Sequence, residues 1–250
     1  MKIVTWNLRC AWNQDGINSF IHRAGFIFQK IKDEKPDIIG FQEVIEKSLE
    51  LLQKMLPEYI FIGQFRSTEY NGEGLYTAIR KDTMELLGLE TIWLSPTPYI
   101  AGSIYEGQSP CPRICVMTQI RNKNTGEIIR VYNTHLDYIS EKVALMGAKD
   151  VIRFIEEYDK KITLPIVLIG DFNVKPNGAT IKECKRSGKL FDLTEEMKTT
   201  YHNYGRGDAK IDYIFVSKEL VFRVEKAETW TDCHEGIYLS DHYPLCAIFN

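Results

Sequence analysis

The segment 165–173, Pro-Ile-Val-Leu-Ile-Gly-Asp-Phe-Asn, constrains the fold of this chain more than any other stretch. Its apolar run at 166–169 is rich in β-branched residues, which predicts a strand buried on both faces. Asp171 and Asn173 follow directly, so a carboxylate and an amide leave the end of that strand together. Ligands of open α/β sheets bind at this edge. A turn that caps the next helix would use the same residues, and the segment alone does not distinguish the two interpretations.

Other strand ends along the chain carry polar residues of the same kind. Short apolar runs predict strands at 2–8, 37–43, 128–134, 210–217 and 245–249. The polar residues at or beside the strand ends are Asn7, Glu43, His135, Asp171, Asn173, Asp212, Asp241 and His242. If these residues share one edge of the sheets, they form a single polar site.

Helical periodicity separates several of these strands. Patterns typical of amphipathic helices cover 17–32, 45–56, 140–158 and 179–187. In the first of them, one apolar stripe is expected to face the core: Ile17, Phe20, Ile21, Ala24, Ile27, Phe28 and Ile31. Strands that alternate with helices in this way favour an α/β fold.

The middle of the chain has a different pattern. Short β-like runs between 59 and 94 are separated by turn residues, which predicts antiparallel hairpins. The segment 95–112 holds four of the nine prolines and predicts a long irregular loop. Tyr99 and Tyr105 make this loop a candidate lining for a compact pocket.

Length and composition are those of a globular protein with a sizeable core. The chain has 250 residues, 44% hydrophobic and 26% charged, and we expect one domain over 1–250. The net charge of −3 gives no bulk attraction to nucleic acid, so binding to a polyanion must be local. There is no apolar run of signal-peptide or membrane-spanning length, and the six cysteines form no Cys-x-x-Cys pair. These features predict a cytoplasmic protein with free thiols and no membrane span.

The donor atoms of the strand-end residues are mostly oxygens. The set holds carboxylates, amides and only two imidazoles, and no histidine–cysteine spacing suits zinc. Oxygen-rich sets favour a hard ion, Mg²⁺ or Mn²⁺. Such an ion suits phosphate chemistry, because it neutralises charge on the non-bridging oxygens while a nearby carboxylate deprotonates water. No serine or cysteine has the local context of an activated nucleophile.

Six short motifs follow one another over residues 6–244. They are Trp6-Asn7, Gln42-Glu43, Asn133-Thr-His135-Leu-Asp137, Gly170-Asp171-Phe-Asn173, Lys210-Ile-Asp212-Tyr-Ile and Ser240-Asp241-His242-Tyr-Pro244. In this order they resemble the motifs of the endonuclease/exonuclease/phosphatase family, the DNase I-like superfamily. The resemblance implies an α/β (α+β) fold built as a four-layer sandwich. Two mixed β-sheets would pack face to face with helices outside, and the site would lie at one end.

The resemblance also implies a metal side of the site and a water-activating group. Asn7 and Glu43 are expected to hold the ion, Glu43 most directly, and Asp241 to complete or adjoin its shell. Asp171 is expected to orient and deprotonate the attacking water with the help of Asn173.

The phosphate side is implied by the same resemblance. His242 is expected to contact the scissile phosphate while the carboxylate of Asp212 orients its ring. His135 is the second histidine on this side.

Three further residues are candidates for substrate binding. Arg113, in Cys-Pro-Arg, can clamp a phosphate with two hydrogen bonds. Arg9 stands where apurinic-site endonucleases of the family carry an aspartate, so we expect it to face a substrate anion and do not expect a second metal of that type. His202 lies on a loop before the strand of Asp212, and similar loops of bacterial members hang over the site.

These motifs predict the reaction but not the leaving group. We expect a Mg²⁺-dependent hydrolase of phosphate esters whose substrate is a small molecule or single-stranded nucleic acid, with no obligate protein partner. The alternatives are a DNA or RNA endo- or exonuclease of the same family and a non-catalytic phosphate-binding module. A lipid-directed role would need an exposed apolar hairpin at 92–94, where a buried core strand is the simpler interpretation.

Overall fold

Two six-stranded sheets form the centre of the structure, a computed structural model that describes residues 1–11 and 15–250. The strand order of the first sheet is β11 (Val224–Thr229), β14 (Leu245–Phe249), β1 (Lys2–Asn7), β2 (Ile38–Val44), β4 (Gly74–Arg80) and β3 (Tyr59–Phe65). The order of the second is β5 (Met84–Trp93), β6 (Ile114–Asn122), β7 (Ile128–His135), β8 (Ile166–Asp171), β10 (Asp212–Ser217) and β9 (Leu190–Asp192). Both sheets are mixed, because β1–β2 and β7–β8 are parallel pairs among antiparallel ones.

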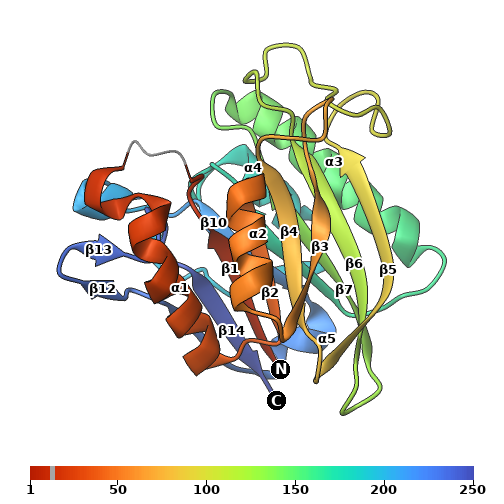
Figure 1. Ribbon diagram of the computed structural model, residues 1–250. Coiled ribbons are helices and arrows are strands. Elements are labelled where there is room, and N and C mark those ends of the chain that lie inside the picture. Colours follow the sequence, from red (N-terminus) through yellow and green to blue (C-terminus); the bar gives the residue numbers. More distant parts are fainter. Residues whose placement is uncertain (12–14) are drawn as a thin grey trace.

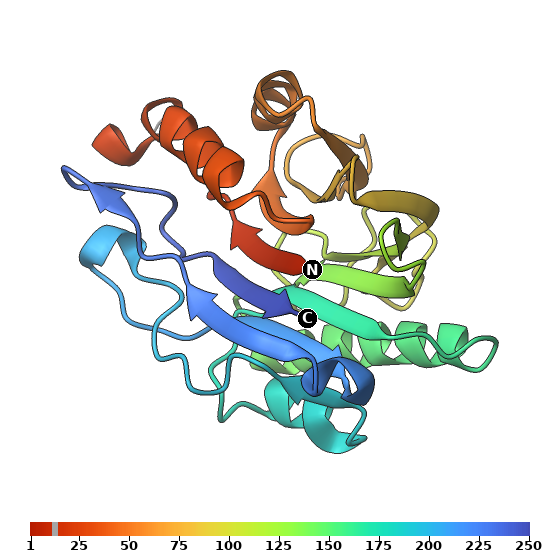
Figure 2. The same cartoon turned by 90° about the horizontal axis from the view of Figure 1, so that it is seen from below.

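Helices cover the outer face of each sheet, so that four layers result (Figures 1 and 2). α1 (Phe20–Glu34) and α2 (Glu46–Met55) pack on the first sheet, and α3 (Glu141–Asp159) and α4 (Ala179–Arg186) pack on the second. α5 (Lys218–Val221) is a single turn after β10. The four-layer sandwich expected from the motifs is therefore confirmed.

Small elements complete the described chain. A hairpin of β12 (Cys233–His234) and β13 (Ile237–Tyr238) lies beside α1 (Figure 1). Two 3₁₀ turns cover Gly16–Asn18 and Asn203–Gly205. Among residues 1–11 and 15–250, no helix is both long and apolar enough to cross a membrane.

The two-residue period of each strand decides which layer a side chain enters. In β1, Ile3 lies in the core between the sheets, whereas Val4 lies under the helices. The same period places Asn7 between the sheets at the end of β1. In β8, Ile169 belongs to the inter-sheet core, and Asp171 follows it two residues later. The polar ends of strands from both sheets therefore meet between the sheets.

The helix predicted over 17–32 has a narrower buried face than its stripe indicated. α1 begins only at Phe20, and Ile17 and Ile21 are 60% and 59% exposed. Successive helical residues lie about 100° apart, so Ile21 falls outside the arc that packs on the sheet. The opposite margin of this arc is occupied by Arg23, which is fully buried.

The hairpins predicted between 59 and 94 are only partly correct, because β3 and β4 pair with each other whereas β5 pairs with β6 in the second sheet. Other elements agree closely with their predictions. The helix predicted over 140–158 is α3, whose N-cap Ser140 accepts a hydrogen bond from the amide of Val143. Ile92 and Trp93 are buried at the end of β5. The segment 92–94 is thus a core strand and not an exposed apolar hairpin.

Gly170 is required where β8 passes β7. A Cβ at this position would lie 1.9 Å from the carbonyl oxygen of Thr134, which is backbone and cannot move aside. We expect Gly170→Ala to lower the free energy of unfolding by about 3 kcal/mol or more. Gly25, in the exposed middle of α1, has no atom within 4 Å of an added Cβ, so Gly25→Ala should raise it by about 0.5–1 kcal/mol. Urea denaturation of both variants measures the two changes, and equal effects of the same sign would contradict this account of Gly170.

Candidate active site

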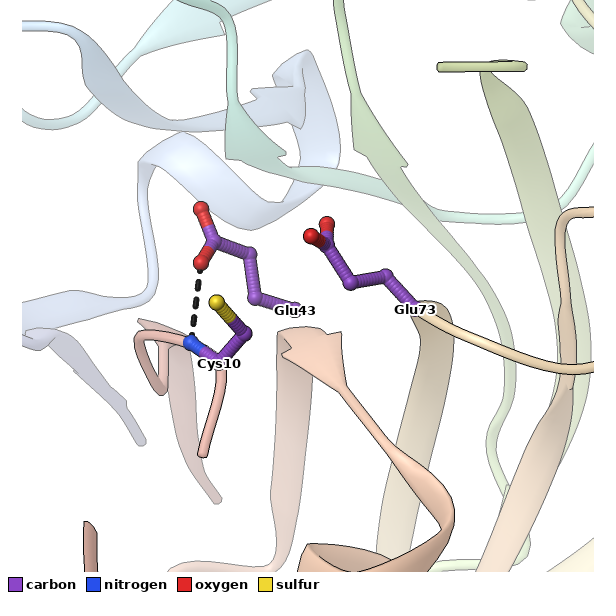
Figure 3. Close-up of side chains that lie close together, drawn as sticks. All are labelled: Cys10, Glu43 and Glu73. Atoms are coloured by element: carbon purple, nitrogen blue, oxygen red, sulfur yellow. Dashed lines mark hydrogen bonds between the residues drawn. The ribbon is translucent and has the colours of Figure 1, made fainter. Parts of the chain in front are cut away.

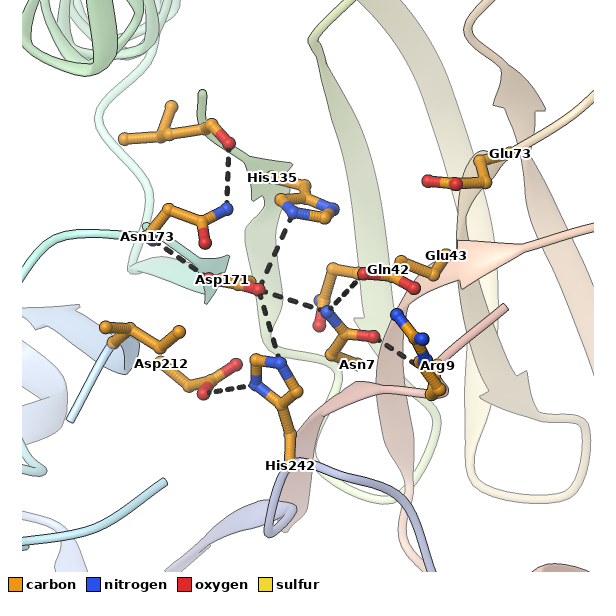
Figure 4. A network of polar contacts seen from close by, with 12 residues as sticks. Asn7, Arg9, Gln42, Glu43, Glu73, His135, Asp171, Asn173, Asp212 and His242 are labelled. Atoms are coloured by element: carbon orange, nitrogen blue, oxygen red, sulfur yellow. Dashed lines mark hydrogen bonds and ion pairs between the residues drawn. The ribbon is translucent and has the colours of Figure 1, made fainter. Parts of the chain in front are cut away.

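A cavity of about 500 Å³ opens at the end of the sandwich where β1, β2, β7 and β8 finish. Its walls combine acidic, basic and aromatic side chains from both sheets: Arg9, Cys10, Glu43, Arg66, Glu73, Cys111, Arg113, His135, Tyr138, Asp171, Asn173, Tyr201, Ile211, Asp241 and His242. Figure 4 shows the polar contacts at its base. Of the residues predicted for the site, Asn7, Asp212 and His202 are absent from these walls; Asn7 and Asp212 lie behind them, bonded to wall residues.

Asn7 connects the two sheets at this base. Its Nδ2 donates to Glu43 Oε1 and to Asp171 Oδ2, each at 3.0 Å, while its Oδ1 accepts from the amide of Arg9 at 2.9 Å. Glu43 belongs to the first sheet and Asp171 to the second. One amide therefore holds two carboxylates close together.

Glu43 reaches the cavity because β2 is irregular at its end. The side chain of Gln42 already points between the sheets, where its Nε2 donates to Asn133 Oδ1 at 2.8 Å. In a regular strand the next side chain would point toward the helices. The register of β2 shifts between Phe41 and Val44, and Glu43 adopts the left-handed conformation with φ 58°. The bulge thus turns Glu43 into the cavity.

Asp171 stands at the centre of the site (Figure 4). Its Oδ1 accepts from the amide of Asn173 at 2.9 Å, and its Oδ2 lies 3.5 Å from His135 Nε2 and 3.8 Å from His242 Nε2. Burial and the nearby charge of Asp212 raise the pKa of Asp171 to about 7. The carboxyl group is therefore a stronger base than an ordinary aspartate.

The two histidines beside Asp171 have opposite electrostatic surroundings. Burial alone would lower the pKa of His242, but Asp212 Oδ2, at 2.9 Å from its Nδ1, outweighs burial and raises that pKa well above the usual value. Burial and then the charge of Arg113 lower the pKa of His135 well below the usual value. At neutral pH, His242 is a cation and His135 is neutral.

The described residues can hold a metal ion at two clusters. Ligand atoms of Asp171, Asp212 and His242 lie within 4.8 Å of one another, and so do those of Cys10, Glu43 and Glu73 (Figure 3). The first cluster is already joined by the Asp212–His242 hydrogen bond.

Glu43 fits a hard cation well. Burial would raise its pKa, but hydrogen bonds from Asn7 and from the amide of Cys10 outweigh burial and lower it. The carboxylate is therefore ionised at neutral pH, and no lysine or arginine within 1–11 and 15–250 forms a salt bridge with it. Asp241 lines the same cavity near Arg9, whose Nε lies 3.8 Å from Asp241 Oδ2. Carboxylate and amide oxygens at this place match the preference of Mg²⁺.

Two of the three predicted substrate-side residues line the cavity. Arg113 is 3% exposed, and its Nε and Nη1 have no hydrogen-bond partner among the described residues. Its guanidinium lies 5.7 Å from the ring centre of Tyr138. Arg9 also lines the cavity, but it is held by Asp15 through Nε at 3.1 Å and Nη2 at 3.2 Å.

His202 differs from its predicted position. It is 2% exposed, and its ring stacks on Tyr243 with 3.8 Å between ring centres. The amides of His202 and Asn203 both donate to the carbonyl of Asp241, at 2.9 and 3.0 Å, which fixes the backbone of this loop. The ring consequently packs among aromatic residues away from the cavity wall.

Sequence reasoning missed four polar or aromatic wall residues. Arg66 and Glu73, joined by a salt bridge, come from the turn between β3 and β4, and Tyr138 and Tyr201 come from loops. Arg66 follows β3, which is mostly half-buried, and Tyr138 lies three residues beyond β7, so the pattern of polar residues at buried strand ends did not include them. The two tyrosines of the loop 95–112 do not line the cavity as expected. Tyr99 is 69% exposed, and Tyr105 donates to Asp150 of α3 at 2.7 Å.

Sequence and structure comparisons agree on the relatives of this chain. The model of the endonuclease/exonuclease/phosphatase family matches residues 4–242. The chain belongs to this family. A crystal structure of a family member from Bacteroides vulgatus has 31% identity and a TM-score of 0.91 over 100% of this chain and 98% of that one. The fold is thus DNase I-like. No curated protein sequence matches the chain.

Other solved structures extend the comparison. A mannosyl-6-phosphatase from Bacteroides thetaiotaomicron has 27% identity and a TM-score of 0.89, over 100% of this chain and 99% of that one. TDP2 from D. rerio, in complex with a single-strand DNA product, has 19% identity and a TM-score of 0.74, over 100% and 98%. At that identity the likeness to TDP2 concerns the fold alone.

The buried ring of His202 predicts an acid-sensitive contribution to stability. Burial lowers the pKa of His202 to about 4, whereas an unfolded histidine titrates near about 6.5. As pH falls below about 6.5, the unfolded state binds the proton before the folded state does. The free energy of unfolding therefore decreases between about pH 6.5 and about pH 4, by up to about 3 kcal/mol. His202→Phe keeps the stacking and cannot bind the proton. Its free energy of unfolding should therefore fall less between about pH 7 and about pH 5 than that of the wild type.

Chemical denaturation at the two pH values measures this difference. His22→Phe is the matched control, because His22 is exposed on α1. The same acid sensitivity in wild type and His202→Phe would contradict the assignment.

Proposed function

We propose that the chain is a divalent-metal-dependent hydrolase of phosphate esters. The observation that carries this proposal is the position of Asp171. Its carboxyl group, with a pKa of about 7, lies beside a cationic His242 and a neutral His135, one hydrogen bond from Asn7. A base placed next to a cation suits in-line attack of water on a phosphorus atom.

We assign Mg²⁺ to Glu43 and Asn7, with Asp241 adjoining, and Mn²⁺ suits the same oxygens. When bound, such an ion neutralises charge on the phosphate and favours attack at phosphorus. Glu43 is suited to this role because its carboxylate is ionised and fixed by two hydrogen bonds.

Asp171 accepts the proton of the attacking water in this proposal. Asn173 fixes the orientation of Asp171 through its amide, and its own Nδ2 is tied to the carbonyl of Leu136 at 3.1 Å. His242, kept protonated by Asp212, donates to the phosphate oxygens as negative charge develops on them. His135 contacts the phosphate as a neutral hydrogen-bonding group.

Arg113 binds the phosphate of the substrate. Its guanidinium is buried with unpaired donors at the cavity wall. Leaving buried donors unpaired is unfavourable, and an anionic oxygen in the cavity would satisfy them. Arg9 is bound to Asp15, so its contribution is a weaker attraction of the anion.

The substrate that best fits is a small phosphate ester. A cavity of about 500 Å³ accommodates a compact molecule, and the net charge of −3 gives no long-range attraction to duplex nucleic acid. The mannosyl-6-phosphatase among the similar structures supports a sugar phosphate. Single-stranded nucleic acid is the second candidate, because Tyr138 and Tyr201 at the cavity wall could stack on a base.

Hydrolysis of a phosphomonoester and a phosphodiester reporter, each with Mg²⁺ and with chelator, tests the proposed function. Asp171→Asn removes the base and should lower kcat/KM by at least about a hundredfold. Asp33→Asn, on the exposed side of α1, is the matched control and should be as active as the wild type. A higher rate on the monoester supports the small substrate, whereas nicking of DNA at low enzyme concentration supports a nuclease. Full activity with chelator, or with Asp171→Asn, would refute the mechanism.

The clamp assigned to Arg113 has its own test. Arg113→Lys keeps a positive charge but loses the planar fork. We expect KM for the better reporter to rise about tenfold, with a smaller change in kcat. Arg153→Lys changes an exposed arginine of α3 in the same way and should leave KM unaltered. An unaltered KM in Arg113→Lys would remove Arg113 from the phosphate site.

A further inference from the structure

Arg23 of α1 is fully buried, and among the described residues its guanidinium donates hydrogen bonds only to backbone carbonyls. Nε donates to Asn18 O and Nη1 to Leu239 O, both at 2.6 Å, while Nη2 donates to Leu8 O at 3.1 Å and to Arg9 O at 3.4 Å. These carbonyls belong to the loop after β1, to the 3₁₀ turn that precedes α1, and to the distant loop that follows β13. One arginine therefore fastens three loops.

The absence of a carboxylate partner is informative. Within residues 1–11 and 15–250, Arg23 forms no salt bridge, and burial lowers its pKa. A buried ion is costly unless its hydrogen bonds are well formed, and an apolar side chain would often stabilise the fold as well. An apolar residue at position 23 could fill the same space, but it could not hold the surrounding carbonyls at fixed positions as Arg23 does.

Two of the three loops carry the proposed metal side of the site. The loop after β1 contains the amides of Arg9 and Cys10, which donate to Asn7 Oδ1 and Glu43 Oε2. Leu239 directly precedes Ser240, whose Oγ donates to the carbonyl of Asn7 at 2.7 Å and lies 3.2 Å from Asp241 Oδ1. The loop after β1 and the loop that contains Asp241 are thus connected to each other at two places. Ser240 connects them near the cavity, and Arg23 connects them farther from it.

The third loop, the 3₁₀ turn that contains Asn18, connects Arg23 to the β12–β13 hairpin. Asn18 presents its carbonyl to Arg23 and also joins the β12–β13 hairpin, because its Oδ1 accepts from the amide of Tyr238 at 2.9 Å and its Nδ2 donates to Gly236 O at 3.0 Å. The hairpin leads directly into Leu239. The position of Leu239 is consequently fixed from two directions.

We propose that Arg23 is a positioning residue for the metal side of the site. Its planar fork sets the distance between the loop after β1 and the loop that contains Asp241. That distance determines whether Asn7, Glu43 and Asp241 can surround one cation. The inference rests on the metal ligands assigned in the proposed function, and it adds a residue that touches neither metal nor substrate.

A positive charge acting through space is the competing explanation, because Asp241 lies close enough to influence the pKa of Arg23. Arg23→Lys separates the two accounts. Lysine keeps the charge but cannot reach carbonyls in three directions with a rigid fork. Arg23→Met removes both charge and fork while keeping much of the volume.

The experiment measures Mn²⁺ binding to the substrate-free protein by electron paramagnetic resonance, together with amide hydrogen exchange in the absence of metal. Arg23→Met and Arg23→Lys should both bind Mn²⁺ about tenfold or more weakly than the wild type. The amides of Arg9 and Cys10 should exchange faster in both variants. Guanidinium ion at millimolar concentration should restore part of the Mn²⁺ affinity to Arg23→Ala.

Arg130→Met is the matched control. Arg130 is also buried, donates to the carbonyl of Ile162 at 2.9 Å, and lies at the opposite end of the second sheet from His135. The Arg130→Met variant should be less stable than the wild type, but its Mn²⁺ affinity and the hydrogen-exchange rates of the amides of Arg9 and Cys10 should be unchanged.

The outcomes are distinguishable. Wild-type affinity and exchange in folded Arg23→Met would overturn the inference, and wild-type behaviour of Arg23→Lys alone would assign the effect to charge and overturn positioning by the fork. If Arg23→Met does not fold, Arg23→Lys and guanidinium rescue of Arg23→Ala decide. If the wild type binds no Mn²⁺, the proposed function fails, and hydrogen exchange still tests the positioning of the loops.

Discussion

The amide of Asn7 is the contact on which the arrangement of the site depends. It donates to Glu43 of the first sheet and to Asp171 of the second. It therefore fixes the distance between these two carboxylates where the two sheets meet. Behind it, Gln42 and Asn133 form a second polar link between the sheets. The Nε2 of Gln42 and the amide of Asn133 are paired, which offsets the cost of burying them, whereas Gln42 Oε1 has no partner among the described residues. The apolar inter-sheet layer and the polar cavity are thus continuous parts of one interface.

Charge within the site is arranged asymmetrically. Asp212 stabilises the cationic form of His242, whereas burial and then the charge of Arg113 disfavour the cationic form of His135. Asp171 lies between them with a raised pKa. Neighbouring groups whose pKa values are pushed apart in this way are typical of acid–base sites. The surroundings of each group, more than its residue type, create this difference.

The two-residue period of the strands made much of the fold and site predictable. Asn7, His135, Asp171 and Asp212 lie on strand ends whose inner faces can be read from apolar neighbours, and the fold implied by the motifs is confirmed. Glu43 reaches the cavity through a bulge that its own sequence does not signal. The burial of Arg23 and His202 depends on carbonyls and rings supplied by distant segments. Such residues cannot be recognised from local pattern. The chemical roles given to the site residues stay predictions.

Left-handed backbone conformations surround the cavity at Arg9, Glu43 and Asn173. Asparagine adopts this conformation readily, but arginine and glutamate do so at a cost of order 1 kcal/mol each. Glycine would relieve that strain at positions 9 and 43, but it would remove two charged side chains from the cavity wall. Glycine would also cost about 0.5–1 kcal/mol in backbone entropy and would remove the hydrogen bonds that Arg9 makes with Asp15 and Glu43 makes with Asn7. The left-handed backbone at Arg9 and Glu43 is thus held by the same contacts that fix the two side chains at the cavity wall.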